Sequence, residues 1–144
     1  MFKAQEMRIL YLFSTADTSV SRVTLNQISA LRKFYPALNI KIACINYDEK
    51  KSLLDSENIF KKKYYDNKIV NYIKSLLFIR KVKKTFCPDI TISNQNAVTT
   101  YNCLVDSNDV KIGIFHAPNF QIKQRGFLPF FLNSLSLKWI LPKL

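Results

Sequence analysis

Three groups of polar residues in this sequence could carry chemistry, and each follows an apolar run. The first is His116, the only histidine, which comes directly after Val110–Phe115. Ligands of open α/β sheets gather where strands end, so a histidine there can stabilise charge that develops on a substrate. A loop histidine without a role is the alternative. No paired carboxylates, metal-ligand cluster or nucleophile–base arrangement accompanies it in the sequence.

The second group is the hydroxyl-rich loop 14–21, which contains Asp17, Thr18 and Ser19. A helix that begins here would direct free N–H groups toward phosphate oxygens. Ordinary N-capping by Thr18 or Ser19 explains the same residues equally well. Asp17 is the only acidic residue of the expected cleft, and it could act as a base toward an acceptor hydroxyl.

The third group comprises Asn94, Gln95 and Asn96, which follow an expected strand at 89–93. Amide side chains donate and accept hydrogen bonds, which suits the hydroxyl groups of a sugar. The same residue types also form ordinary turns. Because no Gly-x-Gly-x-x-Gly sequence is present, we expect no nicotinamide or flavin cofactor, and we assign no cofactor or metal.

Alternating strands and helices must position these groups. Short apolar runs predict strands at 8–13, 40–45, 89–93 and 110–115, and helical periodicity predicts helices at 20–35, 68–86 and, more weakly, 97–105. This alternation predicts an α/β domain with a Rossmann-like, doubly wound parallel sheet. The Lys-rich stretch 48–66 shows no clear pattern. The residues expected to face the core from the first two helices are Val20, Val23, Ile28, Leu31 and Phe34 or Tyr35, and Ile69, Ile73, Leu76, Leu77 and Val82 or Lys83.

The chain carries a formal net charge of +12, which favours an anionic partner such as nucleic acid, a phosphorylated substrate or an acidic membrane. Most of this charge is lysine rather than arginine, and no regular aromatic interleaving accompanies it, so we expect no specific nucleic-acid recognition. A solvated lysine-rich face is the alternative. The residues that we expect to meet an anionic membrane surface are Lys74, Arg80, Lys81, Lys83 and Lys84.

Other features of the sequence favour a cytoplasmic protein attached peripherally to the inner face of the cytoplasmic membrane. The three cysteines are far apart, which predicts reduced core residues. No signal peptide and no run long enough to span a membrane is evident. The apolar segment 127–141 could lie in the membrane interface or could pack against further protein.

Three segments, taken in order, resemble a known family. Arg8-Ile-Leu-Tyr followed by Thr18–Asn26 resembles the first strand, loop and helix of glycosyltransferases with the GT-B fold, especially the large retaining family four. Pro88-Asp89-Ile resembles the approach to a later strand of that family. Gly113-Ile-Phe-His116 resembles the strand that delivers its active-site histidine. The resemblance covers nearly the whole chain, although Thr18 and Ser19 stand where the family has a glycine pair.

The resemblance implies that residues 1–144 form one domain, the acceptor-side half of a GT-B architecture, without the donor-binding C-terminal domain. It implies transfer of a sugar from a nucleotide-sugar donor to a polysaccharide, lipopolysaccharide or lipid-linked acceptor. His116 would then donate to the transferred sugar, and the chain alone would be inactive. The alternatives are a basic α/β module that binds a polyanion without catalysis, and an inactive gene remnant.

Overall fold

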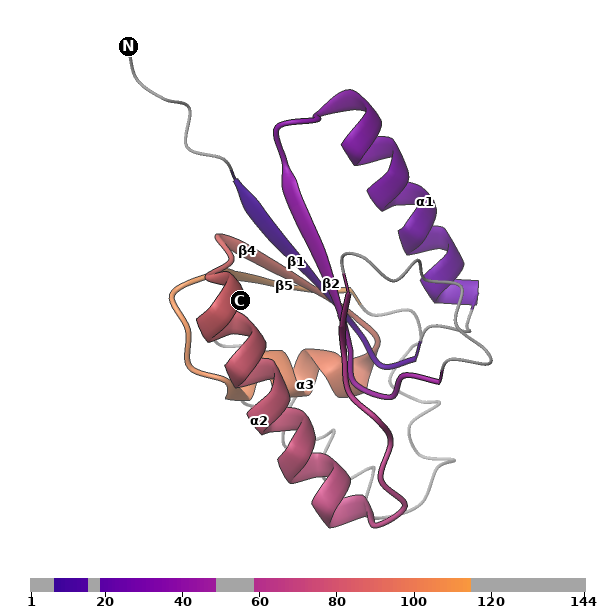
Figure 1. Ribbon diagram of the computed structural model, residues 1–144, viewed down its shortest axis with the longest axis vertical. Helices are drawn as coiled ribbons and strands as arrows, with labels where there is room; N and C mark the ends of the chain where they lie inside the picture. The colour runs from indigo at the N-terminus through magenta and orange to yellow at the C-terminus, as the bar shows by residue number, and fades with distance from the viewer. Residues whose placement is uncertain (1–6, 16–18, 49–58, 115–144) are drawn as a thin grey trace.

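The computed structural model describes residues 7–15, 19–48 and 59–114, which form a parallel sheet with helices on both faces (Figure 1). In chain order the elements are β1 (Arg8–Phe13), α1 (Ser19–Phe34), β2 (Asn39–Cys44), β3 (Ile59–Lys61), α2 (Lys68–Phe86), β4 (Ile90–Asn94), α3 (Asn96–Leu104) and β5 (Val110–Ile114). The strands lie in the order β3-β2-β1-β4-β5, and every neighbouring pair is parallel. The predicted Rossmann-like, doubly wound α/β fold is therefore confirmed.

β1 takes the centre of the sheet because its side chains are apolar on both faces. Phe13 packs toward Ile28 of α1, whereas Leu10 and Leu12 pack toward Ile79 of α2. All three β1 side chains have an exposed fraction of 0%. A strand that is buried on both faces appears in sequence as a continuous apolar run, which is why its position was predictable.

The connections place α1 on one face of the sheet and α2 and α3 on the other. The step from β1 to β2 runs toward one edge, and the steps from β3 to β4 and from β4 to β5 run the opposite way. Right-handed crossovers that run in opposite directions use opposite faces of a parallel sheet. The helical connections therefore switch from one face of the sheet to the other between β1 and β4.

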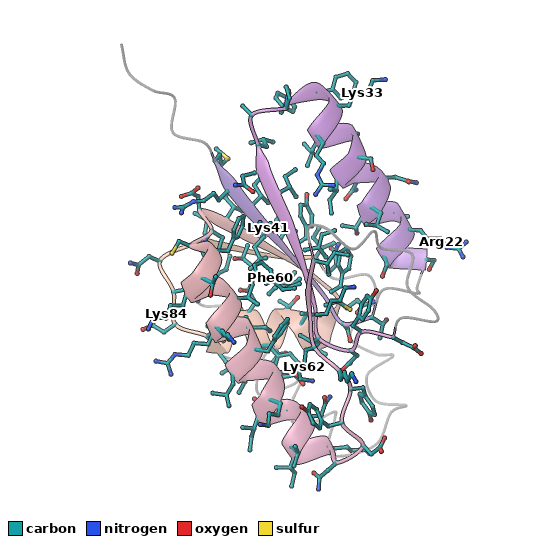
Figure 2. All side chains as sticks on the ribbon, in the orientation of Figure 1. Arg22, Lys33, Lys41, Phe60, Lys62 and Lys84 are labelled. Carbon is teal, nitrogen blue, oxygen red and sulfur yellow. The ribbon has the colours of Figure 1, made fainter. Side chains whose placement is uncertain are left out.

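β3 is the strand that the sequence pattern did not predict. It has three residues, lies at the sheet edge and pairs only with β2. The ring centroids of Phe60 and Phe86 lie 6.5 Å apart. The Lys41 Nζ lies 5.5 Å from the centroid of the Phe60 ring (Figure 2). Three residues, of which only Ile59 and Phe60 are apolar, are too few to produce a recognisable period, so the strand could not be recognised within the unassigned stretch 48–66.

The predicted inner face of α1 is correct in part. Ile28 is buried and Leu31 is partly buried against the same core, as expected, whereas Val23 is 55% and Phe34 is 71% exposed. The helix also buries Ser21 and Thr24, since these small side chains fit close to the sheet. Hydrophobicity alone therefore selected some positions that face solvent.

The predicted inner face of α2 is also correct only in part. Leu76 is partly buried against the core and Val82 and Lys83 are buried, as expected, whereas Ile69, Ile73 and Leu77 are exposed. Ser75, Ile79 and Phe86 complete the buried side. Three apolar residues that we expected to find in the core are therefore part of the protein surface.

Lys83 does not belong to the predicted membrane-facing set. Its Nζ lies 2.8 Å from Oδ2 of Asp109, and both side chains are almost completely buried. The ammonium also donates to the Ser107 hydroxyl at 3.0 Å. A buried lysine needs a paired charge and hydrogen-bond acceptors, and the turn before β5 supplies both. Lys74, Arg80, Lys81 and Lys84 are exposed, as predicted.

Candidate functional site

The chain changes faces between β1 and β4, which makes the carboxyl ends of these strands the candidate site. Beyond β1 the chain leads to α1 on one face, and beyond β4 it leads to α3 on the other (Figure 1). The two connections diverge, and open α/β sheets bind ligands at such a switch point. The residues that follow the strands are Ser14 and Thr15 on one side and Gln95 on the other.

Asn94 and Thr24 join the two sides of this switch point. The Asn94 amide Nδ2 donates to the Thr24 hydroxyl, which ties the last residue of β4 to α1. Asn94 is 1% exposed and Thr24 is 2% exposed. Among the residues that the structure describes, nothing donates to the buried Asn94 Oδ1. The pair thus positions α1 and leaves an amide oxygen with unused accepting capacity at the switch point.

Hydroxyl groups hold the α1 side of the switch point in place. The Ser21 hydroxyl donates to the backbone oxygen of Thr15 at 2.7 Å. Ser19 begins α1 and is exposed. The start of the helix is therefore held against the end of β1, with Ser19 open to solvent.

A second polar network supports the site from the opposite face. Asn102 of α3 donates through Nδ2 to the Ser93 hydroxyl at 3.5 Å, and Ser93 donates to the Ile112 oxygen at 3.1 Å. The Asn102 Oδ1 is also buried without a donor among the described residues. Asn102 was not singled out from sequence, although a polar residue in a short apolar helix is a usable signal.

Gln95 lies between these networks in a backbone conformation that glycine adopts most readily. Its φ is 96° and its ψ is 144°. The backbone N–H donates to the Ile114 oxygen at 3.3 Å, and the backbone oxygen accepts from the Thr99 amide at 3.1 Å. Both neighbouring elements hold the residue in place. Strain of this kind persists where the surroundings fix it, and it concentrates at functional sites.

Gln95→Gly is expected to raise the free energy of unfolding by about 1 kcal/mol. The substitution relieves strain of about 1–3 kcal/mol, and the greater freedom of unfolded glycine offsets part of that gain. Urea denaturation measures the change. Cys87, at φ 47° and ψ 62°, provides the comparison, because the left-handed region is less strained. Cys87→Gly should give a smaller increase in the free energy of unfolding. A decrease in that free energy for Gln95→Gly would show that the Gln95 backbone is not strained.

The sequence-predicted site residues divide into three groups. Asn94 and Gln95 lie at the switch point, although Asn94 is bonded to Thr24 rather than open to solvent. Ser19 begins α1, and the backbone of Asn96 begins α3. Asp17, Thr18 and His116, and the side chain of Asn96, lie outside the described residues.

No protein-family model matches this sequence, and no curated protein matches it at a significant level. The switch point is therefore the feature of this chain from which a function can be inferred. Within the parts of the chain described here, no three histidine, cysteine or acidic side chains lie close enough to hold a metal ion. The polar groups at the switch point are amides and hydroxyls, which recognise hydroxyl and phosphate groups by hydrogen bonding.

Lys62 is a buried cation that sequence reasoning missed. Its Nζ donates to the backbone oxygens of Ile45 and Lys63, each at 3.1 Å, and to Asn71 Oδ1 at 2.6 Å. Burial lowers the pKa of this ammonium. A lysine has three hydrogens to donate, and all three are used. Lys62 therefore fastens α2 to the carboxyl ends of β2 and β3 and has no donor left for a ligand (Figure 2).

Proposed function

We propose that this chain is the acceptor-side domain of a glycosyltransferase that moves a sugar from a nucleotide-sugar donor to a glycan or lipid-linked acceptor. The observation that carries the proposal is the switch point between β1 and β4, where Asn94, Gln95 and Thr24 meet in a Rossmann-like sheet. Amide and hydroxyl groups at this position suit the hydroxyls of a carbohydrate. The order of the sequence motifs adds a resemblance to GT-B enzymes.

The end of β5 lies beside this site. The Gln95 N–H donates to the oxygen of Ile114, the last residue of β5, and His116 follows two residues later. In the proposed reaction His116 donates a hydrogen bond to the transferred sugar, and Asp17 accepts the proton of the acceptor hydroxyl. A preorganised donor there stabilises charge that develops as the sugar is transferred.

The proposal assigns the acceptor rather than the donor to this domain. Thr18 precedes α1 in the sequence and Ser19 begins it, at positions where a glycine pair would allow a diphosphate to approach the backbone closely. Their side chains favour contact with hydroxyl groups at longer range. A donor-binding domain would supply the nucleotide-sugar site, and no cofactor takes part in the proposed reaction.

We further propose peripheral attachment to the inner face of the cytoplasmic membrane, where lipid-linked acceptors are found. Among the described helices, none has both the length and the apolar character of a membrane span. The net charge of +12 supports attraction to anionic lipids.

Titration of the full chain with a soluble, short-tailed analogue of a lipid-linked sugar tests the acceptor assignment. We expect the backbone amide NMR signals of Ser14, Thr15 and Gln95 to shift on binding. Asn94→Ala should weaken binding about tenfold, because loss of its hydrogen bond to Thr24 releases α1 from the end of β4 and disturbs the site that these elements form. Asn39→Ala is the matched control, because it removes an amide at the start of β2, at the opposite end of the sheet. Equal binding by both variants, or no shift at the switch point, would contradict the proposal.

A protein consisting of residues 1–144 is expected to turn over no nucleotide sugar. One half-site cannot hold two substrates in the geometry of attack, and that positioning accounts for much of the rate of bimolecular enzyme reactions. Radiolabelled sugar transfer with a panel of nucleotide sugars measures this. Turnover by the purified chain would show that the donor site lies within these residues.

A further inference from the structure

We propose that the outer surface of α2 is a membrane-docking surface, which inserts its amino-terminal half among anionic lipids and turns the candidate site toward the bilayer. The α2 outer surface comprises the exposed residues Ile69, Val70, Ile73, Lys74, Leu77, Arg80, Lys81 and Lys84. This inference rests on the proposed function for its biological purpose, but its physical basis is independent of sugar transfer.

The first observation is the exposed apolar stripe that the sequence assigned to the core. Ile69, Ile73 and Leu77 recur every four residues and therefore lie on one side of the helix. Their exposed fractions are 72%, 50% and 55%. Single exposed apolar residues are ordinary, whereas an aligned set on one helix indicates a surface with a partner.

The second observation is the charge of the same side. Arg80, Lys81 and Lys84 continue the stripe through the last turns of the helix, and α2 contains no acidic residue. Lys84 projects away from the body of the protein (Figure 2). An apolar half followed by a cationic half matches the interface of an acidic bilayer, where apolar groups enter the acyl boundary and cations meet phosphates.

Charge excludes two other occupants of this surface. The segment 115–144 carries Lys123, Arg125, Lys138 and Lys143 and no acidic residue, so it does not complement a cationic helix. A second copy would present the same cationic helix, and each copy carries a net charge of +12, which opposes the approach of the two copies. A bilayer that contains phosphatidylglycerol satisfies both the charge and the apolar stripe.

The third observation fixes the orientation of the docked domain. Lys62, which follows β3, donates to Asn71 of α2 and to the Ile45 oxygen after β2. This contact places the first turns of α2 beside the carboxyl ends of the strands, the same end that carries the candidate site (Figure 1). Insertion of Ile69, Val70 and Ile73 would therefore direct the switch point toward the headgroups, where a lipid-linked sugar is presented.

Co-sedimentation of the full chain with sugar-free vesicles tests the charged half of the surface. We expect binding to phosphatidylcholine vesicles that contain phosphatidylglycerol, little binding to pure phosphatidylcholine, and weakening as salt rises. Lys81→Gln with Lys84→Gln should weaken binding about 30-fold, because each cation near an acidic leaflet contributes about a factor of five. Arg22→Gln with Lys33→Gln is the matched control, because it removes two exposed charges from α1 on the other face.

A second pair of variants tests the apolar half. Ile73→Ser with Leu77→Ser should weaken binding about tenfold and make the remainder fully reversible by salt, since apolar insertion is insensitive to screening. Val23→Ser with Phe34→Ser, at exposed positions of α1, is the matched control. All four positions are exposed, and a thermal melt of each variant confirms that it folds.

Failure of this inference is distinguishable from failure of the proposed function. Equal weakening by the α1 and α2 variants, or no binding to acidic vesicles, would overturn docking by α2. A dimer in solution that Ile73→Ser with Leu77→Ser dissociates would also overturn it, because the surface would then join two copies. Vesicle binding that depends on α2, together with no NMR response to the acceptor analogue, would retain the docking surface and reject sugar transfer.

Discussion

Asp109→Asn is expected to lower the free energy of unfolding by about 3–5 kcal/mol, the usual consequence of removing one partner from a buried ion pair. The substitution keeps the shape of the side chain but leaves the Lys83 ammonium buried without its counter-charge. The two side chains are 2% and 1% exposed, so water cannot replace the lost partner. Urea denaturation measures the effect, which is a large share of the 5–15 kcal/mol that stabilises a typical domain.

Two comparisons isolate the contribution of burial. Arg8→Gln removes the cation of the Arg8–Asp89 pair, whose side chains are 36% and 40% exposed, and should change stability by less than about 1 kcal/mol. Lys83→Met combined with Asp109→Leu removes both buried charges and should recover most of the loss. A small effect of Asp109→Asn would show that water reaches the ion pair.

The same pair predicts a dependence on pH. Burial alone would raise the pKa of Asp109, but hydrogen bonds from Lys83 and Ser107 outweigh it and hold the pKa below its ordinary value of 3.8. A carboxyl group whose pKa is lowered by folding stabilises the protein fully above its unfolded pKa. That contribution is lost as the pH falls through the folded pKa. Acidification below about pH 4 should therefore destabilise the wild type more than Asp109→Asn.

In a longer protein that joins residues 1–144 to a donor-binding domain, His116→Ala is expected to lower kcat/KM about 100-fold or more. This is the scale for loss of one preorganised donor to developing charge. His116 follows β5 in the sequence. The backbone oxygen of Ile114, the last residue of β5, accepts a hydrogen bond from the Gln95 N–H, so β5 ends beside the switch point. Transfer of a radiolabelled sugar to the lipid-linked acceptor measures the change.

Asn119→Ala is the matched control for His116→Ala, since it truncates a polar residue three positions further along the sequence. It should leave kcat/KM within a few-fold of the wild type. The unfolding midpoint of each variant is measured alongside, so that a loss of activity is not mistaken for a loss of folding. Equal activity of His116→Ala and the wild type would remove His116 from the proposed reaction.

The positions of the strands were easier to predict from the sequence than the side of each helix that is buried. β1 is a continuous apolar run from Ile9 to Phe13, so its position follows from composition alone. α1 buries Ser21 and Thr24, and α2 buries Ser75 and Lys83, because the space against the sheet admits small side chains and one paired cation. A helical period specifies that one side is buried, but tertiary packing decides which side.

The candidate site was predictable in position but not in its contacts. Asn94 and Gln95 follow an expected strand, which was enough to place them at the ligand-binding end of the sheet. Thr24 and Asn102 come from helices, and only the assembled sheet brings them to the end of β4. The strain at Gln95 depends on its hydrogen bonds with Ile114 and Thr99, which no local pattern encodes.

The central place of β1 has a consequence for synthesis on the ribosome. One edge of β1 pairs with β2, which follows soon after it in the sequence. The other edge pairs with β4, which is synthesised much later, and the hydrogen bond from the Arg8 amide to Asp89 spans 81 residues. At a translation rate of about 5–20 residues per second, the roughly 50 residues between the ends of β2 and β4 take about 2–10 s to emerge. During that interval the nascent chain presents the unpaired edge of a largely apolar strand, which is the kind of template that recruits other chains. The βαβ unit of β1, α1 and β2 is therefore the segment that we expect a chaperone to bind first.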